Sequence, residues 1–93
     1  MQNIIQITYC TQCNWLLRSS WMGQELLITF KDEIDTLSLK PGKGGIFQIY
    51  ANKKLIWCRK ENKGFPEITV LKKLVRDVIA PDKNLGHIDR KKN

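Results

Sequence analysis

The sequence predicts an α/β protein in which four strands form one mixed sheet and two helices pack on it, in the order β-α-β-β-β-α. Three observations carry this prediction. A β-branched run near the N-terminus is followed by residues with helical spacing. Further along, two apolar runs are joined by a short hairpin connection. A last amphipathic segment, between two prolines, has the spacing of a second helix.

The first strand and the first helix begin a crossover unit. Residues 4–9 are short, β-branched and apolar on both faces, which is typical of a strand buried on both sides. Residues 14–31 have helical spacing, and Gly23 in their middle would let this helix lie close to the sheet. The next strand covers residues 34–39. A right-handed crossover makes these two strands parallel neighbours.

The second half of the chain predicts a turn, a hairpin and a helix. Residues 41–45, Pro-Gly-Lys-Gly-Gly, are typical of a turn. A phosphate-binding loop would need Ser or Thr after the lysine and then a helix, whereas a strand follows here, at residues 46–50. A hairpin connection leads to a fourth strand at 55–59. Pro66 then stands at the first position of a helix whose buried face is marked by residues 68–78.

Length and composition predict one ordinary domain. The chain has 93 residues, of which 42% are hydrophobic and 27% charged, so we treat 1–93 as a single domain with an irregular basic tail at 82–93. No run could span a bilayer and no signal peptide is evident, so we expect a cytoplasmic protein without a membrane partner. The net charge of +7 raises the question of whether the protein binds nucleic acid. No nucleic-acid-binding motif accompanies the spread basic residues, so we expect a solvated basic surface instead.

The candidate site is Cys10-Thr-Gln-Cys13, where the first strand gives way to the first helix. Free N–H groups and the helix dipole favour a thiolate at a helix start. Two cysteines at this spacing can close a disulfide and exchange two electrons with a partner. Strand, Cys-x-x-Cys and helix in this order are thioredoxin-like. The favoured interpretation is therefore a thiol/disulfide redox site at the start of the helix, where Cys10, as the first and more exposed thiol, would attack.

Two other interpretations of the cysteine pair stay open. Cys10 and Cys13 could belong to a zinc site in a non-enzymatic metal- or protein-binding module. A structural zinc needs four ligands, and only Cys58 and His87 remain, neither in a second close pair. The pair could also be inert packing. We expect Cys58 to be a buried bystander in a strand and His87 to have a surface or capping role.

We expect the redox partner to dock beside the cysteines. Trp15 and Trp21 fall within the first turns of a helix that carries apolar residues on more sides than one sheet can cover. Phe65 could form a wall close to the thiols. The partner would be a protein, or glutathione as a co-substrate on the same surface, and no other cofactor is expected. The alternative is that the second helix and the tail cover both tryptophans.

The chain also resembles the selenoprotein W-like group of the Rdx (SelT/SelW/SelH) proteins, in its cysteine-containing bacterial form. The resemblance covers most of the chain and rests on residues 9–13, 21–27, 39–41, 45–47, 57–60, 64–66 and 85–87. It implies a thioredoxin-like fold and a thiol oxidoreductase or redox-partner role in cell redox homeostasis. Many animal members carry selenocysteine at the position of Cys13, which implies that the more reactive atom sits there. The attacking thiol is therefore left open between Cys10 and Cys13.

Overall fold

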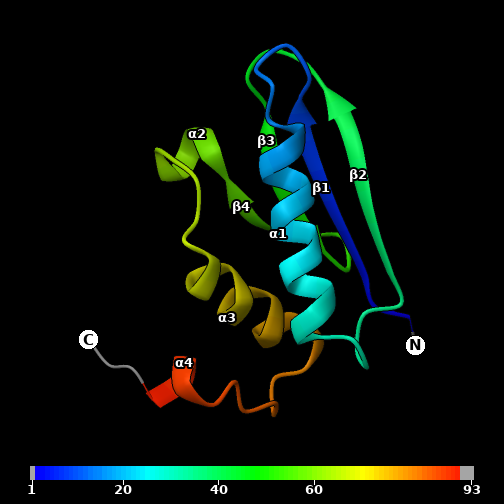
Figure 1. The fold of residues 1–93 in the computed structure, drawn as a ribbon, viewed down its shortest axis with the longest axis vertical. Coiled ribbons are helices and arrows are strands. Elements are labelled where there is room, and N and C mark those ends of the chain that lie inside the picture. The colour runs from blue at the N-terminus through cyan, green and yellow to red at the C-terminus, as the bar shows by residue number, and fades with distance from the viewer. Residues whose placement is uncertain (1, 91–93) are drawn as a thin grey trace.

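The computed structural model describes residues 2–90 and confirms the predicted order of the main elements (Figure 1). The strands are β1 (Ile4–Cys10), β2 (Thr36–Gly42), β3 (Phe47–Ala51) and β4 (Lys54–Cys58). The main helices are α1 (Leu16–Thr29) and α3 (Ile68–Ile79). Two short helices, α2 (Arg59–Asn62) and α4 (His87–Arg90), were not predicted. No helix in this part of the chain is long and apolar enough to cross a membrane.

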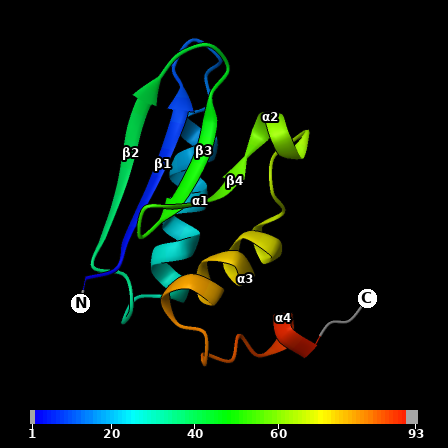
Figure 2. The ribbon, with the colours of Figure 1, turned by 180° about the vertical axis from the view of Figure 1, so that it is seen from behind.

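The sheet is mixed, as predicted, with the strand order β2-β1-β3-β4. β1 pairs in parallel with β2 and antiparallel with β3, and β3 pairs antiparallel with β4. Because β1 lies between β2 and β3, the chain that connects β2 to β3 must pass over the C-terminal end of β1. In Figures 1 and 2 this connection lies at the same end of the sheet as the β1–α1 junction. Cys10, the last residue of β1, is therefore enclosed by a segment far away in sequence.

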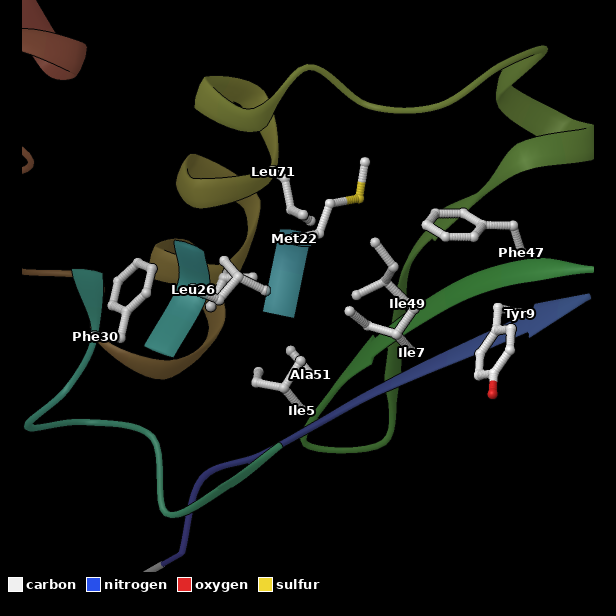
Figure 3. Packing of buried hydrophobic residues seen from close by; sticks show 11 residues of the cluster. Ile5, Ile7, Tyr9, Met22, Leu26, Phe30, Phe47, Ile49, Ala51 and Leu71 are labelled. Carbon is white, nitrogen blue, oxygen red and sulfur yellow. The ribbon is translucent and has the colours of Figure 1, made fainter. Parts of the chain in front are cut away.

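α1 and α3 lie on one side of the sheet, and the core fills the space between the two layers (Figures 1 and 2). In Figure 3, side chains of β1 and β3 point toward those of α1 and α3. The residues at the centre of this packing are at most 1% exposed and include Ile5, Ile7, Ile49, Met22, Leu26 and Leu71. Ile4 on the other face is 44% exposed. The expectation that β1 is buried on both sides is therefore wrong.

The uncovered face of the sheet forms an open groove of about 840 Å³. Alternate residues of β1, Ile4, Gln6 and Thr8, line it together with Gln48 and Tyr50 of β3. The Tyr50 hydroxyl donates a hydrogen bond to Gln48 Oε1 at 3.2 Å. Most residues that line the groove carry a polar or charged group, which makes a sheet with helices on one side only compatible with water.

Gly23 allows α1 to lie close to the sheet, as its position in the helix suggested. A Cβ atom at this position would lie 2.9 Å from Leu37 Cδ2 and 3.9 Å from Leu39 Cδ2, both in β2. A side chain here would force the leucine or the helix to move. Gly23 therefore sets the distance between α1 and the parallel β1–β2 pair.

The end of β2 and the start of α3 differ from the predicted positions, because the backbone at each place is extended further along the chain than expected. Pro41 and Gly42 belong to β2 and not to the following turn, because β1 pairs with β2 as far as Gly42. The turn between β2 and β3 is thus shorter than predicted. α3 begins at Ile68 with Glu67 as its N-cap, so Pro66 precedes the helix and does not occupy its first position.

The segment after α3 is held by Arg76. Arg76 Nη1 donates hydrogen bonds to Lys83 O and to Asp89 Oδ2, each at 2.9 Å. Asp89 lies in α4. The tail at 82–93, predicted to be irregular, thus contains a short helix that is tied back to α3. Residues 91–93 of the tail lie outside the described residues.

Candidate redox site

The Cys-x-x-Cys motif precedes the first helix instead of opening it. Cys10 ends β1, residues 11–14 form a turn, and Trp15 is the N-cap of α1. Asn14 has φ 60°, in the left-handed region, and its N–H donates to Thr11 O at 3.1 Å, which closes the turn. The motif lies at the predicted strand–helix junction, but its residues form a turn before the helix and not the first helical turn. The helix dipole acts mainly within the first turn, so it contributes less to Cys10 than expected.

The two thiols differ in exposure, in the order opposite to the one expected. All three cysteines are free thiols. Cys10 is only 1% exposed, whereas Cys13 is half-buried. Cys10 is paired opposite Gly42 of β2, and Thr11 N–H extends this pairing by donating to Gly42 O at 3.1 Å. The expectation that Cys10 is the more accessible thiol is thus wrong, because the β2–β3 connection covers it.

The Cys10 and Cys13 thiols interact closely enough to move each other's pKa, and they do so in opposite directions. The hydrogen bond from Cys13 is the largest effect that lowers the pKa of Cys10, and the N–H group of Gly45 adds to it. Donating that hydrogen bond is the main cause that raises the pKa of Cys13, followed by burial and by repulsion from a charged Cys10. The pair therefore releases its first proton more readily than its second.

Aromatic side chains from three segments pack beside the motif. The Trp15 ring meets Phe65 edge-on, with ring centroids 4.9 Å apart, and Phe47 edge-on at 6.4 Å. Phe47 and Phe65 are themselves 4.9 Å apart. Trp57 Nε1 donates to Gly64 O at 2.9 Å, which fixes the segment that carries Phe65. The structure thus brings together Trp15 and Phe65, both predicted near the thiols, as half-buried residues. Phe47 was missed because its position on β3 indicates only a core residue.

Two arginines lie over this aromatic cluster. The Arg18 guanidinium carbon is 4.1 Å from the Phe65 ring centroid, and that of Arg59 is 4.9 Å from the Trp15 centroid. Arg59 also donates from Nε and Nη2 to Gly45 O, each at 3.4 Å. Its charge acts to lower the pKa of Cys13. Nothing in the sequence singled out Arg18, and the composition marked Arg59 only as one of the spread basic residues. The only signal at Arg59 was its place in the 57–60 segment of the family resemblance.

The remaining candidate residues lie on α1, on β4 and in α4. Trp21 is 48% exposed on α1. Cys58 is buried at the end of β4, where Gln48 Nε2 contacts its sulfur at 3.8 Å. The N–H of Glu61 is the main cause that lowers the pKa of Cys58. His87 is exposed in α4, and α4 lies at the opposite end of the molecule from the β1–α1 junction (Figure 1).

The described residues offer the cysteine pair few metal ligands. Within residues 2–90, no group of three or more His, Cys, Asp or Glu side chains is placed to hold a metal ion. A structural zinc needs four ligands. The zinc interpretation of Cys10 and Cys13 therefore has no third ligand in this part of the chain.

We expect removal of either thiol to shift the pKa of the other in opposite directions. In a Cys58→Ser background, Cys13→Ala removes the hydrogen bond that favours the Cys10 thiolate, so the pKa of Cys10 rises. Cys10→Ala removes both the acceptor of the Cys13 hydrogen bond and the negative charge that repels a Cys13 thiolate. The pKa of Cys13 therefore falls toward the ordinary value of about 8.5. Ultraviolet absorbance of the thiolate as a function of pH measures both. Shifts of the same sign in the two variants would contradict the proposed contact.

The chain is similar to known proteins over most of its length. A model described as the Rdx family matches residues 4–77. A selenoprotein W-related protein from Vibrio cholerae has a crystal structure with 52% sequence identity and a TM-score of 0.82, covering 84% of this chain and 98% of that one. A protein from Bordetella parapertussis gives 51% identity and a TM-score of 0.81, covering 83% of this chain and 98% of that one. A search of curated protein sequences found no match.

These similarities agree with the geometry of the fold. The family match runs from the start of β1 into the last turns of α3, so it includes the whole sheet, the cysteine pair, Gly45 and Arg59. The four-stranded mixed sheet with its crossover helix is the thioredoxin-like architecture that the sequence predicted. The resemblance drawn from the sequence is thereby confirmed, and the chain belongs to the Rdx family.

Proposed function

We propose that this protein is a thiol/disulfide redox protein in which Cys10 and Cys13 cycle between the dithiol and the disulfide. The observation that carries the proposal is the contact between two free thiols of unequal exposure. One sulfur is open to a partner while the other is held beside it and away from solvent. Membership of the Rdx family, which is associated with redox chemistry, supports the same function.

The order of reaction that we propose follows from the unequal exposure of the two thiols. The Cys13 sulfur attacks one sulfur of the partner's disulfide while its proton passes to the Cys10 thiolate, the form that the lowered pKa of Cys10 favours. A bond forms between Cys13 and the partner while the partner's own S–S bond breaks. The leaving thiolate takes the proton from Cys10. Cys10 then attacks the Cys13 sulfur, which closes the intramolecular disulfide and releases the partner's second thiolate to take a proton from water. Two electrons pass from the protein to the partner.

Burial of Cys10 gives this order a physical reason. A side chain that is 1% exposed is out of reach of an external disulfide, yet it lies beside the Cys13 sulfur. Cys10 is thus restricted to the resolving step. Its lowered pKa suits that step, because the thiolate is the attacking species.

An apolar stripe on α1 is suited to bind a protein partner. Leu17, Trp21 and Ile28 are 81%, 48% and 69% exposed and are four and seven residues apart, so they lie along one side of the helix. Exposed apolar side chains arranged in this way mark docking surfaces. We propose that the partner is a protein that packs on this stripe and presents its disulfide to Cys13. Oxidised glutathione would react at Cys13 without using the stripe.

Mild oxidation with diamide followed by peptide mapping tests the redox pair. We expect a Cys10–Cys13 disulfide with Cys58 left as a free thiol, because only the first two thiols are in contact. Cys58→Ser should form the same disulfide in the same yield, and Cys13→Ser should form no intramolecular disulfide. A disulfide that includes Cys58, or one that forms only between two chains, would contradict the proposal.

Charge substitution on the apolar stripe tests the docking surface. We expect Leu17→Glu to slow oxidation of the protein by insulin disulfides by roughly tenfold, since burying a charge against a partner is costly. Its effect on oxidation by glutathione disulfide should be much smaller. Val70→Glu is the matched control, because Val70 is 40% exposed on α3 and lies outside the stripe. Equal slowing with both oxidants, or equal slowing by the control, would show that the stripe is not a docking surface.

A further inference from the structure

Arg59 connects three parts of the chain that meet at the thiol pair. It begins α2, directly after β4. Its Nε and Nη2 atoms both donate to Gly45 O in the turn between β2 and β3. Its guanidinium carbon lies 4.9 Å from the ring centroid of Trp15, two residues after Cys13. A guanidinium suits this position, because it can donate from two nitrogens to one carbonyl and still contact an aromatic ring.

Gly45 is the residue through which these contacts reach the sulfurs. Its backbone N–H lies close enough to both sulfurs to lower the pKa of Cys10 and to act in the same direction on Cys13. Gly44 and Gly45 have φ values of 72° and 74°, which glycine adopts freely and other residues adopt at a cost. Two successive glycines leave a turn many conformations, so a single conformation needs an external contact.

The surroundings of the turn identify that contact. A Cβ built at Gly44 would meet nothing within 4 Å, and one built at Gly45 would meet only Arg59 Nη2, at 3.5 Å. Arg59 therefore provides the support that the glycine backbone lacks.

We propose that Arg59 is a positioning residue of the redox site, which holds Gly45 so that its N–H stays directed at the two thiols. The inference rests on the proposed function, because the attacking thiol is the group that this donor serves. The turn between β2 and β3 then does more than cover Cys10. It supplies a hydrogen-bond donor whose position depends on a side chain from α2.

The charge of Arg59 adds to this effect at Cys13. The ion pairs among residues 2–90 involve Lys72, Arg76 and Lys83, and none of them includes Arg59. A guanidinium without a carboxylate partner keeps its full effect on a nearby thiolate. A lysine at this position would keep the charge but lacks the planar fork that bonds Gly45 O from two nitrogens. Charge and positioning can thus be separated by substitution.

The test uses Cys10→Ala/Cys58→Ser as the parent, so that Cys13 is the only thiol. We compare the parent with Arg59→Gln, Arg59→Lys and Arg18→Gln by the pH dependence of iodoacetamide alkylation. Arg59→Gln should raise the pKa of Cys13 and slow alkylation at neutral pH by about tenfold, as one pKa unit requires. Arg59→Lys should slow it by roughly threefold, because it keeps the charge and loses the fork. Arg18→Gln should match the parent, since Arg18 contacts Phe65 and is not bonded to Gly45.

A second measurement follows the position of Gly45 directly. Hydrogen exchange of the Gly45 amide, observed by NMR, should be faster in both Arg59 variants than in the parent and unchanged in Arg18→Gln. A merely structural loss of stability would speed exchange across the sheet, and urea unfolding of each variant measures that loss. Arg59→Lys keeps the aliphatic stem and the charge, so it decides the question if Arg59→Gln does not fold.

Two results would overturn the proposal. If Arg59→Lys matches the parent in both alkylation and Gly45 exchange, Arg59 acts as a charge alone. If Arg59→Gln and Arg18→Gln give the same result, Arg59 has no special role. Neither readout requires a disulfide, because the parent has one thiol. Failure to form the Cys10–Cys13 disulfide in the native protein would contradict the proposed function and leave the test of Arg59 intact.

Discussion

The candidate redox site depends on the order of the strands in the sheet. β1 lies between β2 and β3, so the connection from β2 to β3 has to cross the end of β1, which is Cys10. This crossing buries one thiol and leaves the other, three residues further on, half-buried in the turn before α1. The difference between an accessible and an enclosed sulfur therefore follows from topology. The hydrogen bond between the thiols, the Gly45 donor and the contact from Arg59 all depend on this crossing.

The aromatic residues near the motif serve two separate purposes. Trp15 packs with Phe47 and Phe65 into a half-buried wall, on which the Arg59 guanidinium lies. Trp21 belongs instead to the exposed side of α1, together with Leu17. The sequence showed aromatic residues close to the cysteines but could not divide them in this way. The division depends on the turn at Asn14, which delays the start of the helix and turns Trp15 toward the core.

Patterns within short stretches of the sequence predicted those elements whose structure depends on residues close together in the chain. The spacing of apolar residues located α1 and α3, and the glycine in α1 indicated its close approach to β2. The Cys-x-x-Cys motif located the site. What the sequence missed depends on contacts between distant segments. Arg59 is fourteen residues from the carbonyl it binds, and α4 is tied to α3 by Arg76 and Asp89. The exposure of Cys10 was predicted wrongly for the same reason, because it is the β2–β3 connection that covers this thiol.

The central claim is that Cys10 and Cys13 form one two-electron couple. Equilibration of the protein in glutathione buffers of graded potential, followed by rapid alkylation and mass spectrometry, measures this directly. The account predicts that both thiols become protected together in one transition, with a tenfold change in the oxidised-to-reduced ratio for every ~30 mV, while Cys58 remains a thiol throughout. A stable glutathione adduct on Cys13 with Cys10 still reduced across the whole range would contradict it.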